Sequence, residues 1–249
     1  MEENRTTCIF GMHPVLEAVR SGKTIDKLML KKGLDSLMLR ELLEEAKRHE
    51  IPFQFVPVEK LDKVAKGGAH QGVVAYLSTI GYSDFEEAVD RACATTEAPV
   101  FVMLDGVSDV RNLGAIARST ECAGANGIIV PAKGGAAINA DAVKSSAGAL
   151  LRIDTCRVSN LKMAVFYLKQ NGFKIVAATE KSDMPIYDVD MTGPVAVIMG
   201  SEQKGISQSL LALADAQARI PMAGEISSLN VSAAASVVLF EIVRQRYGK

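Results

Sequence analysis

Several polar side chains cluster where an apolar run, predicted to be a strand, passes into a segment with helical spacing. The stretch is LDGVSDVRNLGAIARSTECAGANGIIV, and its polar members include Asp109, Arg111, Asn112 and Arg118. Arginine offers five donors in a planar fork suited to phosphate, and asparagine can both donate and accept. Because a helix N-terminus also favours anions, this combination is suited to bind a phosphate or a ribose hydroxyl. The competing interpretation is that Asn112 only caps the helix and Arg118 is a surface charge.

The spacing within this stretch predicts where the helix begins. A helix starting near Leu113 carries Gly114 and Arg118 on one face, because residues four apart are neighbours on a helix. Arg118 is then expected in the second turn, close to Asn112 at the helix entry.

Two further loops follow predicted strands in the same way. The second loop is Met199–Ser207, in which Gly200 ends an apolar strand and allows close approach to the backbone. The third is Ile220–Ser232, where one of Ser227, Ser228 and Asn230 is expected to cap a long helix. Open parallel sheets bind ligands at the carboxyl ends of their strands, so we expect the three loops to form one site. For each loop alone, an ordinary strand-to-helix turn is the competing interpretation.

Motifs of other enzyme classes are missing. GVSDVRNLGA does not fit GxGxxG, which argues against a nicotinamide dehydrogenase. GSEQKGIS has the glycine spacing of a P-loop, but Ile206 follows Gly205 where lysine is required. There is no GxSxG elbow. The three histidines lack the spacing of a zinc site, so no metal is expected.

Composition indicates a globular chain with a sizeable core. Apolar residues make up 48% of the 249 residues, and no apolar run is long enough to span a bilayer. The start MEENRTTCIFG lacks the basic-then-apolar order of a secretory signal, and four scattered cysteines are typical of reduced thiols. A cytoplasmic location is therefore expected. The net charge of −1 does not itself indicate a nucleic-acid partner, although a nearly neutral protein can carry a basic face.

The pattern of elements divides the chain into three parts. Residues 1–78 alternate strand-like and helix-like runs and are expected to form a compact α/β unit. Residues 79–98 are expected to form an acidic linker, in which Ser83 and Glu86 predict a capped helix. Residues 99–249 alternate strands and helices, which predicts a parallel sheet with helices on both faces.

The three loops, in this order, resemble the motifs of the SpoU/TrmH family of RNA ribose methyltransferases. The matching segments are RNLGAIARSTECAGANGIIV, VIMGSEQKGIS and IPMAGEISSLNVSAAASVVLFEIVRQR. Nearer the start, IFGMHPVLEAV and HQGVVA are similar to the family's substrate-binding domain. The resemblance covers nearly the whole chain, and it is closest to enzymes that methylate a guanosine ribose in 23S rRNA.

The resemblance implies a fold that periodicity does not show. Residues 99–249 would form a SPOUT-type parallel sheet with a carboxyl-terminal trefoil knot, a feature rare among proteins. Residues 1–78 would form a small RNA-binding domain of the L30e-like type. S-adenosylmethionine would be the cofactor, and the chain would be a homodimer with catalytic residues near the subunit interface.

The family's functional residues carry over to the positions that match its motifs. The implied catalytic set is Asn112, Arg118, Glu202, Asn230 and Ser232. The implied cofactor-binding set is Met199, Gly200, Ile220, Leu229 and Asn230. The family view makes Arg118 the base, but an arginine pKa above about 12 makes it a poor one. We therefore prefer that it binds the adjacent phosphate and polarises the hydroxyl.

The implied reaction transfers a methyl group from S-adenosylmethionine to the 2′-hydroxyl of a guanosine in 23S rRNA. The alternatives are the same chemistry on tRNA, or a non-catalytic RNA-binding or ribosome-assembly protein with this fold. Phosphate contacts are expected from lysines of the front domain, although a solvated helix face is an equal interpretation for each. These candidates are Lys31, Lys32, Lys60, Lys63 and Lys66.

Overall fold

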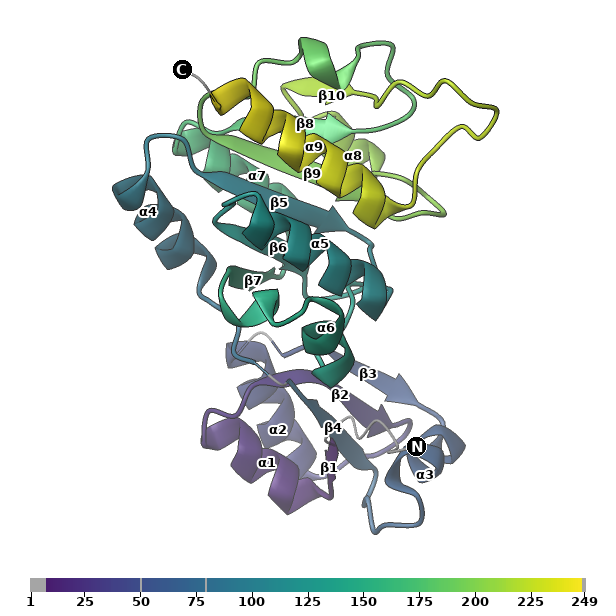
Figure 1. Cartoon of the computed structure of the whole chain (residues 1–249). Coiled ribbons are helices and arrows are strands. Elements are labelled where there is room, and N and C mark those ends of the chain that lie inside the picture. The colour runs from purple at the N-terminus through teal and green to yellow at the C-terminus, as the bar shows by residue number, and fades with distance from the viewer. Residues whose placement is uncertain (1–7, 50, 79, 248–249) are drawn as a thin grey trace. The chain divides into compact units, whose positions relative to one another are not determined.

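The computed structural model describes residues 8–49, 51–78 and 80–247, which belong to two compact units (Figure 1). One unit comprises Met1–Gly81 with Ala137–Ala140, and the other comprises Tyr82–Ala136 with Asp141–Lys249. Each unit has a sheet and an apolar core of its own.

The first unit is built on a four-stranded mixed sheet with the order β1-β4-β2-β3. Its strands are β1 (Cys8–Phe10), β2 (Ile25–Lys31), β3 (Phe53–Val56) and β4 (Val73–Leu77). Its helices are α1 (Met12–Arg20), α2 (Leu37–Arg48) and α3 (Val58–Ala65). β2 pairs parallel with β3, and β4 pairs antiparallel with both β1 and β2.

Alternate residues of β2 face opposite sides of this sheet, as the two-residue period of a strand requires. Leu28 and Leu30 are buried in a cluster with side chains of α1 and α2. Met29 is buried on the other face with Leu61 of α3. The apolar residues of β2 therefore hold helices on both faces of the sheet.

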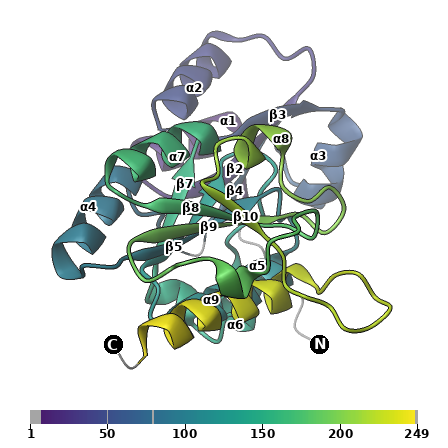
Figure 2. The ribbon, with the colours of Figure 1, turned by 90° about the horizontal axis from the view of Figure 1, so that it is seen from above.

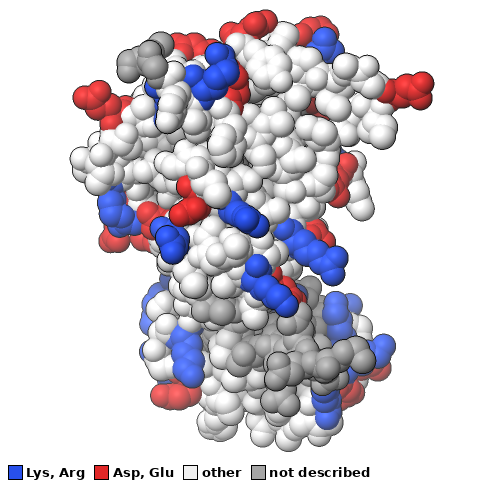
Figure 3. Space-filling view, viewed as in Figure 1, with Lys and Arg blue, Asp and Glu red and all other residues white. Residues whose placement is uncertain are grey.

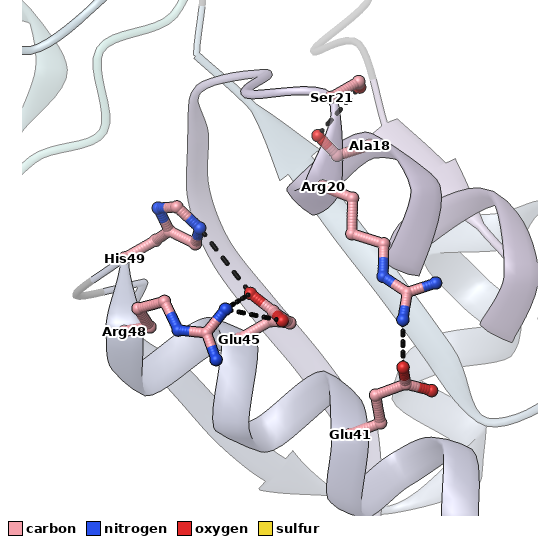
Figure 4. A network of polar contacts seen from close by, with 7 residues as sticks. All are labelled: Ala18, Arg20, Ser21, Glu41, Glu45, Arg48 and His49. Atoms are coloured by element: carbon pink, nitrogen blue, oxygen red, sulfur yellow. Dashed lines mark hydrogen bonds and ion pairs between the residues drawn. The ribbon is translucent and has the colours of Figure 1, made fainter.

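One ion pair links α1 to α2, and two further contacts lie at the end of α2 (Figure 4). Arg20 of α1 pairs with Glu41 of α2. Glu45 lies 3.0 Å from Arg48 and 3.6 Å from His49. Solvated pairs of this kind contribute only about 0–1 kcal/mol each, so the apolar cluster beneath them supplies most of the stability.

The second unit is built on a six-stranded sheet, β10-β8-β9-β5-β6-β7, in which every neighbouring pair is parallel. Its strands are β5 (Val100–Asp105), β6 (Gly127–Pro131), β7 (Asp154–Val158), β8 (Lys174–Ala178), β9 (Val195–Gly200) and β10 (Ala216–Ala218). Its helices are α4 (Phe85–Thr95), α5 (Val110–Cys122), α6 (Ala140–Ser145), α7 (Leu161–Gln170), α8 (Gln208–Leu211) and α9 (Val231–Arg246). Two 3₁₀ turns are η1 (Ala149–Leu151) and η2 (Ile186–Asp188).

Helices cover both faces of the parallel sheet, with α4 and α7 on one side and α5 and α9 on the other (Figure 2). Phe101 and Met103 of β5 are buried in a cluster with apolar side chains of α4 and α7. On the other face α5 packs against α9, and the hydroxyls of Ser119 and Ser236 lie 2.7 Å apart. The predicted parallel sheet with helices on both faces is confirmed.

The acidic segment contributes α4 to the second unit, where its apolar face is buried in the same cluster as α7. Asp84 caps this helix, because its carboxylate accepts a hydrogen bond from the Glu87 N–H at 3.0 Å. The Ser83 hydroxyl donates instead to Asp154 at 2.7 Å. The predicted capping residue, Ser83, is therefore wrong by one position.

The strand order determines where a ligand site can form. From β5 the chain runs outward through β6 and β7, then crosses to β8 and returns with β9 between β8 and β5. The carboxyl ends of β5 and β9 are therefore adjacent, with Asp105 paired to Gly200. A reversal of strand order of this kind opens a crevice in which parallel sheets bind ligands.

Candidate active site

The loops that follow β5 and β9 begin side by side. Asp105 and Gly200 are paired at the ends of the two strands. The Asp105 carboxylate accepts a hydrogen bond from the Ser207 N–H at 2.7 Å, which ties the far end of the second loop to β5. Two of the three loops singled out in the sequence therefore meet at this edge.

Asp109 sets the start of α5. Its carboxylate accepts hydrogen bonds from the N–H groups of Arg111 at 2.8 Å and Asn112 at 3.0 Å, which is the geometry of an N-cap. The helix begins at Val110, so the predicted start near Leu113 is wrong by three residues. Because Asp109 is the cap, the side chain of Asn112 is available for other contacts.

Asn112, Glu202 and Asn230 form one hydrogen-bonded group, called here the amide–carboxylate cluster. Asn112 Nδ2 donates to Glu202 Oε1 at 3.1 Å, and Asn230 Nδ2 donates to Asn112 Oδ1 at 3.1 Å. Asn230 Nδ2 also contacts Glu202 Oε1. Each residue comes from a different one of the three loops, so the tertiary structure brings the loops together as expected.

Ser232 orients Asn230. The Asn230 Oδ1 caps α9 and accepts hydrogen bonds from the Ser232 N–H at 2.9 Å and the Ser232 hydroxyl at 2.6 Å. Since its oxygen is occupied, the Asn230 amide must turn its NH₂ group toward Asn112 and Glu202. Ser232 thus joins the cluster through Asn230.

Arg118 lies outside the amide–carboxylate cluster. Because α5 starts at Val110, Arg118 stands in the third turn and not the second. Residues six apart on an α-helix are separated by about 120° around its axis, so Asn112 and Arg118 face different directions. The Arg118 side chain is exposed, and no ion pair within the described ranges holds it. The predicted position of Arg118 beside Asn112 is therefore wrong within this chain.

A cavity of about 280 Å³ adjoins the cluster, and Glu202 borders both. Its walls are the segments that follow β8 and β9 and the segment that leads into α9. Four of the residues expected to hold a cofactor line it, namely Met199, Gly200, Ile220 and Leu229. The fifth, Asn230, is instead part of the cluster. The volume is close to the lower end of the range for ligand pockets, about 300 Å³.

Gly200 is required by the fold of the cavity wall. A Cβ at this position would lie only 2.6 Å from the Gly205 carbonyl oxygen and would also meet the backbone of Ile206. The loop returns over the end of β9 through paired backbone hydrogen bonds between Ser201 and Gly205, 2.8 and 3.2 Å long. The close approach expected at Gly200 is therefore made by the protein's own loop.

Two groups of residues line the cavity although the sequence did not predict that they would hold the cofactor. Thr179, Glu180 and Lys181 follow β8 and line the cavity. Ser227 and Ser228 also line it, although neither caps α9. In the sequence, Thr179, Glu180 and Lys181 can be recognised only as residues that follow an apolar strand. The strand order of the folded sheet shows that β8 lies beside β9.

In the part of the chain that the structure describes, no three His, Cys, Asp or Glu side chains are grouped so that they could hold a metal ion. None of the helices within those same residues has the length and apolar character needed to cross a bilayer.

Comparison with known proteins identifies the family to which the chain belongs. Residues 99–240 match the SpoU rRNA methylase family, and residues 8–82 match a domain described as RNA 2′-O ribose methyltransferase substrate binding. A Staphylococcus haemolyticus protein described as a TrmH family tRNA/rRNA methyltransferase is 34% identical over 239 residues, which is 96% of each chain.

Two solved structures extend this comparison. The AdoMet-bound rRNA methyltransferase of Sinorhizobium meliloti is 26% identical, with a TM-score of 0.61, and the match covers 95% of this chain and 86% of that one. The TrmH/SpoU tRNA modifying enzyme of A. aeolicus is 30% identical, with a TM-score of 0.55, and the match covers 65% of this chain and 84% of that one. The family match and the shared length show that this chain belongs to the SpoU rRNA methylase family.

Proposed function

We propose that this chain, an S-adenosylmethionine-dependent RNA 2′-O-methyltransferase of the SpoU family, methylates the ribose of a guanosine in 23S rRNA. The observation that carries this proposal is the amide–carboxylate cluster beside the cavity, with Glu202 common to both. A cofactor site and a surface group that can orient a hydroxyl are thereby adjacent.

The residues of the cavity fit S-adenosylmethionine. Met199, Ile220 and Leu229 supply apolar surface for the adenosine, and the glycine-containing loop after β9 supplies backbone donors and acceptors. Two carboxylates, Glu180 and Glu202, and two ammonium groups, Lys181 and Lys204, border the cavity. Charges of both signs suit S-adenosylmethionine, which carries sulfonium and ammonium groups and a carboxylate. The bound cofactor supplies an electrophilic methyl group whose transfer leaves a neutral thioether.

The cluster positions the ribose in this proposal. Two amides hold the Glu202 carboxylate in one orientation, and all three side chains lie where RNA can reach them. Ordered alignment of this kind can lower a barrier by up to about 7–11 kcal/mol. Asn112, Glu202 and Asn230 therefore act by orienting the sugar, and Ser232 acts by orienting Asn230.

Arg118 binds the phosphate next to the target ribose. Because an arginine guanidinium stays charged in proteins, it donates hydrogen bonds while phosphate or solvent assists loss of the hydroxyl proton. The proposal includes a homodimer with Arg118 near the subunit interface. The separation of Arg118 from the cluster of its own chain supports this arrangement.

The comparisons support ribosomal RNA over tRNA. The Sinorhizobium meliloti rRNA methyltransferase matches 95% of this chain, whereas the A. aeolicus tRNA enzyme matches 65%. We accordingly assign RNA binding to residues 1–78, an L30e-like domain, and catalysis to residues 99–249, a domain with a carboxyl-terminal trefoil knot. The proposed phosphate contacts in the front domain are all exposed, as this role requires: Lys31, Lys32, Lys60, Lys63 and Lys66.

The test is to map ribose methylation in rRNA and tRNA from cells with and without this protein. We expect one guanosine in 23S rRNA to lose its 2′-O-methyl group when the protein is absent. Loss from tRNA alone would replace the proposed substrate. If no methyl group is lost and calorimetry detects no binding of S-adenosylmethionine, the chain is instead a non-catalytic RNA-binding protein.

A further inference from the structure

We propose that a ridge of four basic residues along α5 and its neighbours binds the RNA backbone beside the active site. The ridge consists of Arg111 and Arg118 on α5, Lys144 on α6 and Arg152, which directly follows η1. This inference rests on the proposed function, because it assigns the surface over which the RNA substrate reaches the amide–carboxylate cluster.

The two arginines of α5 are aligned by the helix itself. Residues seven apart on an α-helix lie within about 20° of each other around the axis and about 10.5 Å apart along it. Arg111 and Arg118 have this spacing, and both side chains are exposed. They therefore form one row of donors along the outer surface of α5.

Each flank of this row is defined by a contact of α5. On one flank lies α9, through the 2.7 Å contact between Ser119 and Ser236. On the other lies α6, because a Cβ on Gly114 would stand only 2.8 Å from the Ala142 carbonyl oxygen. Asn112 belongs to the α9 flank by its helical position. Asn112 therefore lies about 100–120° around the helix axis from the two arginines, on the flank that faces α9.

Lys144 and Arg152 widen the row on its α6 flank. Ala142 and Ser145 contact α5 at Gly114, and Lys144 projects from the same short helix into solvent. η1 packs against α5, and Arg152 approaches Glu121 of α5 at 4.0 Å. Basic side chains gather over α5, α6 and the segment after them (Figure 3).

The charge of the ridge is largely uncompensated. Arg111, Arg118 and Lys144 form no ion pair within the residues that the structure describes. The single acidic contact, Glu121 with Arg152, is long, and Arg152 remains 76% exposed. Two further carboxylates lie close by, Asp109 at the cap of α5 and Asp141 in the first turn of α6. The four cations outnumber these acids and are exposed, so they attract a polyanion, and arginine and lysine are the usual donors to phosphate.

The outer surface of the ridge fits RNA better than it fits the centre of a two-fold subunit contact. A two-fold interface sets the same patch of both subunits face to face, so an interface centred on the ridge would oppose like charges. The subunit contact proposed near Arg118 must therefore lie to one side of the row. An RNA backbone along α5 would instead neutralise the row and carry its ribose past Asn112. The ridge would therefore determine the direction from which the substrate enters.

The experiment compares charge reversal on the ridge with charge reversal on the other face of the sheet. Lys144→Glu and Arg111→Glu change the ridge, and Lys162→Glu on α7 is the matched control (Figure 2). Binding of an unmodified 23S rRNA transcript is measured over a range of salt concentrations. Methyl transfer to that transcript and calorimetric binding of S-adenosylhomocysteine are measured on the same preparations, and Lys144→Gln serves if Lys144→Glu does not fold.

We expect each ridge variant to bind the transcript at least about 5-fold more weakly at low salt, and to raise KM with kcat changed less than about 2-fold. The slope of log affinity against log salt should fall by about 0.7 for each lost phosphate contact. Lys162→Glu should change the affinity by less than about 2-fold. S-adenosylhomocysteine binding should be unchanged in all variants.

Equal losses in ridge and control variants, or no loss in either, would overturn the ridge proposal. A change in sedimentation without a change in RNA affinity would assign the ridge to a subunit contact and overturn it as well. If the unaltered protein binds the transcript but does not methylate it, the proposed function fails while the ridge is still judged by the binding data alone.

Discussion

Asn112 and Glu202 lie 90 positions apart in the chain and share a hydrogen bond of 3.1 Å between Nδ2 and Oε1. One residue stands in the first turn of α5 and the other in the loop after β9. The bond exists because β5 and β9 are neighbours in the sheet. Disrupting this hydrogen bond therefore tests whether the two motifs act as one site.

Replacing Asn112 by aspartate should uncouple the site. The new carboxylate would face the Glu202 carboxylate and repel it, and misplacement of about 1 Å at such a site costs about 100-fold in rate. We expect single-turnover methyl transfer to fall by about that factor, with little change in melting temperature. Asn160→Asp, at the cap of α7, is the control because aspartate also caps well. Normal turnover in Asn112→Asp would remove the cluster from the mechanism.

Arg118→Lys tests the role of the planar guanidinium. Lysine keeps the charge but cannot form the paired hydrogen bonds of arginine with a phosphate. We expect turnover to fall at least about 10-fold, which corresponds to a loss of about 1.4 kcal/mol. Binding of S-adenosylhomocysteine should stay within about 2-fold of the original value. Steady-state kinetics and calorimetry measure the two quantities. Near-normal turnover in Arg118→Lys would show that the planar guanidinium is not needed.

Gly200→Ala should damage the cavity. The added methyl group would meet the Gly205 carbonyl oxygen at 2.6 Å, so the loop over the end of β9 must move. Overpacking of this kind typically costs about 1–3 kcal/mol, and we expect S-adenosylhomocysteine to bind at least about 5-fold more weakly. Gly193→Ala is the control, because a Cβ there would meet no atom within 4 Å. Equal affinities of the two variants would show that the loop tolerates the shift.

Gly114→Ala sets helix propensity against packing. Alanine would favour the helix by up to about 1 kcal/mol. Its methyl group, however, would meet the Ala142 carbonyl oxygen at 2.8 Å and the Ser145 side chain more closely. We expect packing to dominate and the free energy of unfolding to fall by about 1–2 kcal/mol in urea titration, within the usual range for overpacking. A variant as stable as the original would show that α6 can move away from α5.

Asp215 should make stability depend on pH. Partial burial acts to raise the pKa of Asp215, but hydrogen bonds from Lys169 Nζ at 2.6 Å and the Ile175 N–H at 2.8 Å lower it overall. A carboxyl with a lowered pKa stabilises the fold above its unfolded pKa, and this contribution is lost as the pH falls through the folded pKa.

Because the pKa of Asp215 is lowered, its contribution to stability is present at neutral pH and is lost in acid. Asp215→Asn should lower the free energy of unfolding at pH 7 by about 1 kcal/mol or less, because the Asp215 side chain is 39% exposed and solvent screens its ion pair. The difference between variant and original should shrink as the pH falls below about 4. Urea titrations at pH 7 and pH 3 measure it. A difference that grows toward low pH would refute this account.

The sequence by itself determined the local features of this protein. Apolar runs such as Val100–Leu104 predict strands buried on both faces, and the polar loops after them were recognisable because a strand end and a helix cap depend on residues only a few positions apart. Those loops contain Asn112, Glu202 and Asn230. The family resemblance supplied their roles, which remain predictions.

The tertiary structure alone decided which elements are neighbours and which directions their side chains face. β8, β9 and β5 are similar apolar strands, so nothing in their patterns shows that β9 lies between the other two. Because Asp109 caps α5, the helix begins three residues earlier than predicted and includes Asn112. Asn112 and Arg118 therefore lie about 120° apart around the helix axis. The physical reason is that strand order and helix rotation depend on contacts between residues far apart in the chain, whose free energies no short segment contains.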